Sequence, residues 1–196
     1  MKLILINGPA RSGKDTAAHA ILNSNAINNP VCFEKFSFPI KHAFAGLMTV
    51  GIDDFGNVDD YENNKGKPIP LLGNASYRDW QIAFAEEFMR LKYGTHIFSK
   101  LFIMRIQQLV SETTVEWLVV VSDCGFQKEV DYVISEFPAE DVAVFCLHRP
   151  GFTFAGDSRE YVNTIDHDKA TFCPITNDGT KEEFEAKVLA NTMEFL

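Results

Sequence analysis

The chain has 196 residues, of which 46% are hydrophobic and 23% are charged, proportions that exclude a disordered, collagen-like or coiled-coil chain. Its 18 lysines and arginines stand against 27 aspartates and glutamates, which gives a formal net charge of −9. Because a protein that binds duplex DNA normally carries a basic face, we expect no nucleic-acid partner. A local group of cations is still enough to hold a small anionic ligand.

The apolar segments and the cysteines indicate neither a membrane protein nor a secreted one. No apolar stretch reaches 18 residues, so we expect no membrane-spanning helix, and the apolar run at the N-terminus is too short for a signal peptide. The four cysteines form no CxxC pair, and three of them lie in apolar runs, as small core residues do. We therefore expect a reduced, cytoplasmic chain that folds as a single domain over residues 1–196.

Strand patterns and helix patterns alternate along the chain. The predicted strands are residues 3–7, 31–38, 115–122, 142–147 and 171–176. The predicted helices are residues 14 to about 26, 76 to about 93, 98–111, 128–137 and 180 to about 195. Three of the strands are near-continuous apolar runs, which is typical of strands covered on both faces. The pattern predicts an α/β fold, a three-layer sandwich in which helices cover both faces of a five-stranded parallel sheet.

Two polar regions interrupt this alternation. Residues 51–73 are rich in Asp, Asn, Gly and Pro, and residues 149–169 are also polar. Long loops in a compact domain are often lids or binding loops. The acidic stretch 53–60 lacks the ligand spacing and the central glycine of an EF-hand, so we interpret it as a solvated loop.

The segment from Gly8 to Thr16 carries the clearest chemical motif. It fits GxxxxGK, with Asp15 where Ser or Thr is usual and Thr16 one position later. It follows a predicted strand and opens a predicted helix, which is the context that a phosphate-binding loop requires. Backbone N–H groups and the helix N-terminus would surround a phosphate, and Lys14 would reach the β- and γ-phosphates. The alternative is an ordinary glycine turn between a strand and a helix.

Asp123 follows the most apolar predicted strand. Ligands of open α/β sheets bind beyond the carboxyl ends of the strands. A carboxylate at this edge, beside the phosphate-binding loop, could hold Mg²⁺ directly or through water. The alternative is that Asp123 caps the next helix.

Three arginines are candidates for binding phosphate groups. Arg78 lies in the first turn of a predicted helix, where the helix dipole opposes a cation unless an anion is near. Arg149 and Arg159 flank the second polar loop, whose closure would bring positive charge to a nucleotide. For each of them an exposed surface charge is the alternative.

Together these residues resemble the bacteriophage deoxynucleoside monophosphate kinases, within the P-loop nucleotide-kinase superfamily. The resemblance rests on residues 11–16, 121–123 with Glu129, 148–151, 157–160 and 175–184. The family also has an Asp after the loop lysine. It often has an Arg two residues after the strand-end Asp, where this chain has Gly125. A donor to the acceptor nucleotide is therefore expected to be missing.

The resemblance implies transfer of the γ-phosphoryl group of ATP to a deoxynucleoside 5′-monophosphate, with ATP and Mg²⁺ as cofactors in the host cytoplasm. It places the acceptor in a region of about 39–100 and a short lid at about 149–169. The implied catalytic residues are Lys14, Arg78, Asp123, Arg149 and Arg159. The implied nucleotide-binding residues are Gly8, Arg11, Ser12, Gly13, Lys14, Asp15, Thr16, Asn177 and Gly179, with Asp15 and Asp123 at the metal.

Two alternatives stay open at this point. The chain could phosphorylate another small phosphorylated metabolite, as the related phosphomevalonate and dephospho-coenzyme A kinases do. It could also be a nucleotide-binding regulator without turnover, a reading that Gly125 favours. The sequence leaves open whether the chain forms a homodimer.

Overall fold

The computed structural model describes residues 1–49, 64–111, 114–162 and 170–196. The chain divides into two compact units. The first unit comprises Met1–Phe36 and Ser99–Leu196, and the second comprises Ser37–Phe98. The second unit spans nearly the same residues as the region expected to hold the acceptor.

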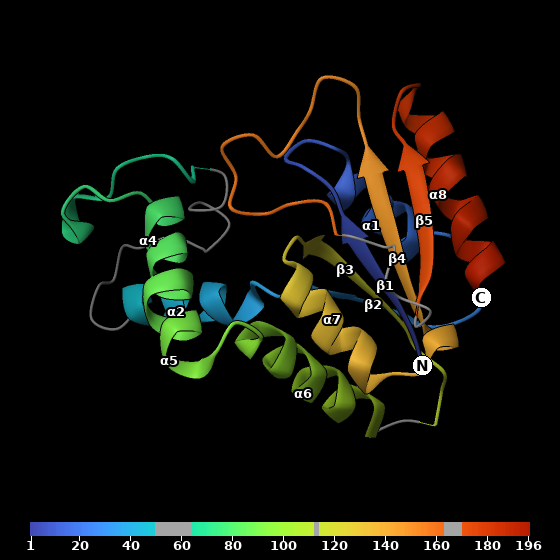
Figure 1. The fold of residues 1–196 in the computed structure, drawn as a ribbon, viewed down its shortest axis with the longest axis horizontal. Coiled ribbons are helices and arrows are strands. Elements are labelled where there is room, and N and C mark those ends of the chain that lie inside the picture. The colour runs from blue at the N-terminus through green and yellow to red at the C-terminus, as the bar shows by residue number, and fades with distance from the viewer. Residues whose placement is uncertain (50–63, 112–113, 163–169) are drawn as a thin grey trace. The chain divides into compact units, whose positions relative to one another are not determined.

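The first unit is built on a parallel sheet of five strands in the order β2-β3-β1-β4-β5 (Figure 1). The strands are β1 (Lys2–Asn7), β2 (Val31–Glu34), β3 (Leu118–Cys124), β4 (Val142–His148) and β5 (Thr171–Thr176). All four pairings between neighbours are parallel. The predicted five-stranded parallel sheet is confirmed.

Helices pack on both faces of this sheet (Figure 1). Helices α1 (Lys14–Leu22) and α8 (Lys181–Phe195) cover one face, and α6 (Ile97–Ser111) and α7 (Gln127–Glu136) cover the other. A short 3-10 helix, η3 (Ala139–Asp141), precedes β4. The core under α1 and α8 includes Ile4, Ile6, Ala17, Val120, Phe145 and Phe184. The alternate strand residues, among them Leu5 and Val121, are equally buried, as a sheet covered on both faces requires.

Several boundaries differ from the sequence prediction. Strand β2 ends at Glu34 rather than at residue 38, because helix α2 (Phe38–Thr49) begins there. This helix was not predicted, although Ile40, Phe44 and Met48 are buried at a helical spacing of four. Strand β3 begins at Leu118 rather than at residue 115, and it includes Asp123. Helix α1 ends at Leu22, earlier than expected.

The second unit is helical in its described part. It contains α2, the 3-10 helix η1 (Pro70–Leu72), and a continuous helical run made of α4 (Tyr77–Ala83), the π-helical segment η2 (Phe84–Arg90) and α5 (Leu91–Tyr93). This run confirms the helix predicted from residue 76 to about 93. Ser76 begins it with a capping box that involves Asp79.

Parts of the two polar regions lie outside the described residues. These parts are 50–63, which include the acidic stretch 53–60, and 163–169 at the end of the expected lid. No helix in the described ranges has both the length and the apolar character that crossing a bilayer requires.

Candidate phosphate-binding site

The GxxxxGK segment forms the turn between β1 and α1. Gly13 has a φ of +105°, in the region that favours glycine, and a Cβ at this position would lie 2.8 Å from Asn177 Nδ2. Arg11 also has a positive φ, +64°. A non-glycine residue rarely adopts this conformation, and where it persists the surroundings hold it in place. The turn is therefore a specific backbone geometry, and the predicted strand, loop and helix are all present.

The start of α1 leaves donors available for an anion. Gly13 is the N-cap residue and gives no side-chain capping bond. The first intrahelical bond runs from Ala17 N to Gly13 O at 2.8 Å. The amides that come before Ala17, in the first turn of α1, have no acceptor inside the helix. The helix dipole also gives this end of α1 a partial positive charge. These are the properties of an anion-binding helix terminus.

Lys14 folds back over this turn. Its Nζ donates hydrogen bonds to Gly8 O at 2.7 Å and to Pro9 O at 2.6 Å. Burial, together with the positive charge of Arg159, lowers the pKa of Lys14 to about 8, while nearby carboxylates act in the opposite direction. A partly desolvated ammonium of this kind gains much from an anionic ligand, because the ligand would restore the interactions lost with water.

Asp15 is tied to two residues that the sequence did not single out. Its Oδ1 accepts hydrogen bonds from Lys35 Nζ and from Ser122 Oγ, both at 3.0 Å. Burial raises the pKa of Asp15, but the bonds from Lys35 and Ser122 outweigh this and leave the pKa below its usual value. Asp15 is therefore ionised, and it connects the start of α1 to β2 and β3.

Asp123 lies near the carboxyl end of β3, as predicted. Its Oδ1 accepts a hydrogen bond from Phe36 N at 2.8 Å, so it orders the turn that follows β2. The N-cap position of α7 is held by Phe126, with no side-chain capping bond, so the alternative interpretation, in which Asp123 caps this helix, is wrong. Its carboxylate is close enough to Lys14 to influence the pKa of that lysine.

Arg149 reaches the phosphate loop from the end of β4. Its Nη1 donates to Arg11 O at 2.8 Å, and its guanidinium lies 4.8 Å from the centre of the Phe152 ring. A hollow of about 380 Å³ opens here. It is lined by Arg11, Gly13, Lys14, Asp15, Thr16, Arg149 and Phe152. Phe152 was not predicted as a site residue. The only indication of it in the sequence is its position in the polar segment that follows Arg149.

Arg159 is fixed by a neighbour in the sequence. Its Nε donates to Asp157 Oδ1 at 2.9 Å, and its Nη2 donates to Asp157 Oδ2 at 2.5 Å. The hydrogen bond to Asp157 raises the pKa of Arg159, so the guanidinium is charged. Because this charge also lowers the pKa of Lys14, the two cations lie in one electrostatic cluster.

Asn177 and Gly179 hold the loop and the last helix in place. Asn177 Nδ2 donates to Ser12 O at 2.9 Å. Gly179 leaves room for the carboxylate of Glu183, which closes the capping box of α8. Ser12 itself is buried, and its Oγ has no hydrogen-bond partner among the described residues. A buried hydroxyl of this kind in a candidate phosphate-binding loop could bond to a ligand.

Arg78 lies in the second unit, in the first turn of α4. It is exposed, and its backbone N–H donates to Lys65 O at 3.0 Å. Its positive charge helps to lower the pKa of the adjacent Asp79, after the stronger effect of the Ser76 hydrogen bonds. A cation in the first turn of a helix was expected to have an anion nearby, and Asp79 is such an anion.

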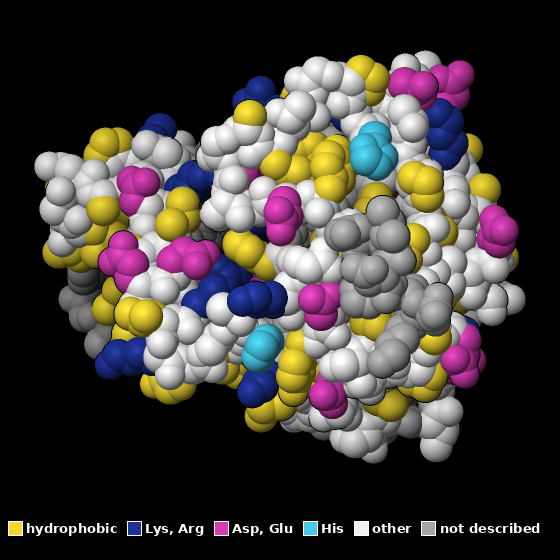
Figure 2. All heavy atoms as spheres, viewed as in Figure 1, with side chains coloured by type: hydrophobic (Ala, Val, Ile, Leu, Met, Phe, Trp, Pro, Cys, Tyr) yellow, Lys and Arg dark blue, Asp and Glu magenta, His cyan; other side chains and the backbone are white. Residues whose placement is uncertain are grey.

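The surface charge is mixed rather than segregated. Figure 2 shows acidic and basic side chains interspersed over the viewed face. A positive site in this acidic protein must therefore be made by particular residues. Lys14, Arg149 and Arg159 gather such charge around the phosphate loop, through the contacts given above.

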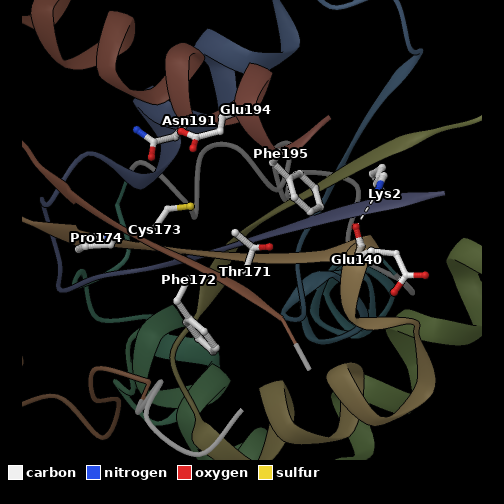
Figure 3. Close-up of a pocket in the computed structure, with 9 residues that line it drawn as sticks. All are labelled: Lys2, Glu140, Thr171, Phe172, Cys173, Pro174, Asn191, Glu194 and Phe195. Atoms are coloured by element: carbon white, nitrogen blue, oxygen red, sulfur yellow. Dashed lines mark hydrogen bonds between the residues drawn. The ribbon is translucent and has the colours of Figure 1, made fainter. Parts of the chain in front are cut away.

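A second hollow, of about 530 Å³, lies elsewhere in the first unit (Figure 3). It is lined by residues of β5 and α8 together with Lys2 and Glu140, whose backbone oxygen accepts a bond from Lys2 Nζ. Lys2 and Thr171 are the first residues of their strands. Since ligands of parallel α/β sheets bind at the carboxyl ends of the strands, this hollow is the weaker candidate.

Among the described residues, no group of three His, Cys, Asp or Glu side chains could hold a metal ion by itself. Mg²⁺ in phosphate-transfer sites usually takes one or two carboxylates and completes its shell with water and substrate phosphates. Asp15 and Asp123 are oxygen ligands of the required kind beside the loop, so their chemistry fits Mg²⁺ bound together with a nucleotide.

No protein-family model matches this chain, and no curated protein sequence matches it. Among solved structures, the chain is similar to an unliganded sugar kinase from Janibacter sp. HTCC2649, with 15% identity over 97% of this chain and 93% of that chain and a TM-score of 0.41. It is also similar to a gluconokinase from Sinorhizobium meliloti 1021, with 14% identity over 98% of this chain and 92% of that chain and a TM-score of 0.42. These similarities concern the fold alone.

Proposed function

We propose that this protein is an ATP-dependent kinase that transfers the γ-phosphoryl group of ATP to a deoxynucleoside 5′-monophosphate. The observation that carries the proposal is the phosphate loop with Lys14 folded over it. A desolvated ammonium, the free amides of a helix start and a hollow of about 380 Å³ meet at one place. Such a site suits a polyphosphate ester. The choice of a monophosphate acceptor rests on the sequence resemblance.

The residues of the loop bind and orient the donor in this proposal. The amides at the start of α1 donate hydrogen bonds to the phosphate oxygens, and Lys14 leaves the carbonyl oxygens of Gly8 and Pro9 to contact the transferring group. Arg149, which already reaches the loop at Arg11 O, adds a further positive charge. Phosphoryl transfer needs mainly positioning and charge stabilisation. The attacking oxygen of a monophosphate is ionised already, so no general base is required.

Asp123 and Asp15 would hold Mg²⁺ together with phosphate oxygens. The ion would supply neutralisation of the negative charge on the phosphates. Asp15 keeps its negative charge because Lys35 and Ser122 donate to it. Asp123 is kept in place by Phe36 N. Both carboxylates are therefore oriented before the ligand arrives.

The proposal is tested by a coupled assay for ADP release. The protein is given ATP and Mg²⁺ with each deoxynucleoside or nucleoside monophosphate in turn, and a reaction without acceptor is the control. Turnover that depends on particular monophosphates is the expected result and identifies the acceptor. Tight ATP binding without any acceptor-dependent turnover would contradict the kinase proposal for these substrates.

Asp123→Asn is expected to raise the Mg²⁺ concentration for half-maximal turnover by about tenfold or more, because one carboxylate charge is lost at the ion. The amide oxygen of Asn can still accept the bond from Phe36 N. The fold should therefore be kept, and circular dichroism and thermal melting check this. A Mg²⁺ titration identical to that of the wild type would leave Asp123 with its structural bond to Phe36 alone.

Arg78→Ala is expected to raise the KM for the monophosphate by about tenfold and to leave the KM for ATP unchanged, because the resemblance implies that Arg78 binds the acceptor phosphate, and a charged hydrogen bond of this kind is worth about 1.5–3 kcal/mol. Steady-state kinetics with each substrate varied in turn measures this. Lys92→Ala, another cation of the second unit, is the matched control and should alter neither constant. A rise confined to the KM for ATP would move Arg78 to the donor side.

A further inference from the structure

The backbone conformation of Gly125 does not require a glycine, but the space beside it does, because a side chain there would clash with Arg159. Gly125 follows β3 directly, and its φ lies outside the left-handed region where a side chain would be strained. A Cβ at this position would lie 2.6 Å from Cδ, 2.7 Å from Cγ and 2.9 Å from Cβ of Arg159. Real Cβ atoms do not approach other heavy atoms so closely. The stem of Arg159 therefore occupies the place that any side chain at residue 125 would need.

The backbone around Arg159 is anchored to the same end of the sheet. Glu160 N donates to Gly125 O at 3.1 Å. Asn7, which is fully buried at the end of β1, donates from Nδ2 to Glu160 O at 3.0 Å and to Cys124 O at 3.1 Å. Its Oδ1 accepts from Val162 N at 3.2 Å. One buried amide therefore ties β1, β3 and the Arg159 segment together.

The guanidinium of Arg159 is also fixed in position. It donates two hydrogen bonds to the carboxylate of Asp157, which also accepts a hydrogen bond from Arg159 N at 3.1 Å. The side chain of Arg159 is 24% exposed. A side chain with its stem packed and its charged end paired loses little further freedom when a ligand binds, so it is preorganised.

We propose that Gly125 is a positioning residue, which allows Arg159 to cross the carboxyl end of β3 and to present a fixed second cation, beside Lys14, to the phosphates of a bound nucleotide. This inference rests on the proposed phosphate-binding function. The sequence suggested that a glycine here removes a donor from the site. In this proposal the cation is supplied by residue 159, and the glycine is what makes room for it.

The test is a double-mutant cycle between the two positions. Tripolyphosphate is the probe, and its affinity is measured by calorimetry for the wild type, Gly125→Ala, Arg159→Gly and the double variant. We expect Arg159→Gly to weaken binding by about 10–100-fold, as the loss of a charged hydrogen bond does. Gly125→Ala should weaken it by at least about threefold in the wild type and have no effect in Arg159→Gly, where all three clashing atoms are gone.

Arg159→Met supplies a variant that keeps the packed stem and removes the charge. We expect its tripolyphosphate affinity to fall as in Arg159→Gly, and its melting temperature to fall somewhat because Asp157 loses its charged partner. Lys100→Met, which removes an exposed cation on α6, is the matched control and should change neither quantity.

The outcomes separate this inference from the proposed function. If Gly125→Ala weakens tripolyphosphate binding equally in both backgrounds, or if Arg159→Met binds as tightly as the wild type, the positioning role is overturned while the phosphate site stands. If the wild type does not bind tripolyphosphate, the proposed function itself is overturned. Should Gly125→Ala fail to fold, the tripolyphosphate affinity of Arg159→Met still decides the question.

Discussion

Lys14→Met is expected to lower turnover by about 10²–10³-fold, because it removes the positive charge closest to the transferring phosphoryl group. Methionine nearly matches the length of the lysine stem, so the packing of the loop should persist. The hydrogen bonds to the carbonyl oxygens of Gly8 and Pro9 would be lost, and because both residues are buried we expect a lower melting temperature as well. Single-turnover kinetics together with thermal melting measures both effects. Turnover within a few-fold of the wild type would contradict the proposed role of Lys14.

The same residue gives a pH test with a defined sign. The pKa of Lys14 is about 8 in the free protein, and bound phosphate should raise it, since an anion favours the charged form. Polyphosphate affinity is then fully present below pH 8 and falls as the pH rises above this value. Binding at pH 8.5 should take up protons, which calorimetry in two buffers with different ionisation enthalpies detects. Lys14→Met should show neither the decline nor the uptake.

The parts of the fold that could be predicted from the sequence are those set by local patterns. Continuous apolar runs marked the strands, because strands covered on both faces have no polar side. The GxxxxGK segment predicted the turn before α1, because its glycines allow a backbone conformation that other residues rarely adopt, as at Gly13. Helix α2 was missed because it begins at Phe38, the last residue of the predicted strand, and a short segment with apolar residues fits a strand as well as a helix.

The partners within the site could not be predicted, because they come from distant parts of the chain. Asp15 is paired with Lys35 and Ser122, 20 and 107 residues away. No periodicity or spacing in one sequence shows that these side chains meet. Gly125 is the clearest example. On its own it indicates a missing cation, and only its contact with the stem of Arg159 shows that the space is filled from another segment.

Asn7→Ala is expected to lower the free energy of unfolding by about 2–4 kcal/mol. The side chain of Asn7 makes three hydrogen bonds to backbone groups, at Cys124, Glu160 and Val162. Alanine would leave these groups without the partner, and an unsatisfied buried polar group costs about 1–3 kcal/mol. Denaturant unfolding measures the change. Asn29→Ala, which removes a single solvent-exposed hydrogen bond to Glu116 O, is the matched control and should cost less than about 1 kcal/mol.

The loss at Asn7 should be concentrated in the segment that carries Arg159. In the wild type the N–H of Val162 donates to Asn7 Oδ1, so its hydrogen exchange reports on this one contact. We expect Asn7→Ala to speed exchange at Val162 by more than the global loss of stability explains, because the segment can open while the sheet stays folded. If the exchange rate at Val162 changes by the same factor as the exchange rates of the β1 amides, Asn7 stabilises the sheet as a whole and not this segment in particular. Tripolyphosphate affinity should fall with this local opening, since Asn7 anchors the backbone that follows Arg159, at Glu160 O and Val162 N.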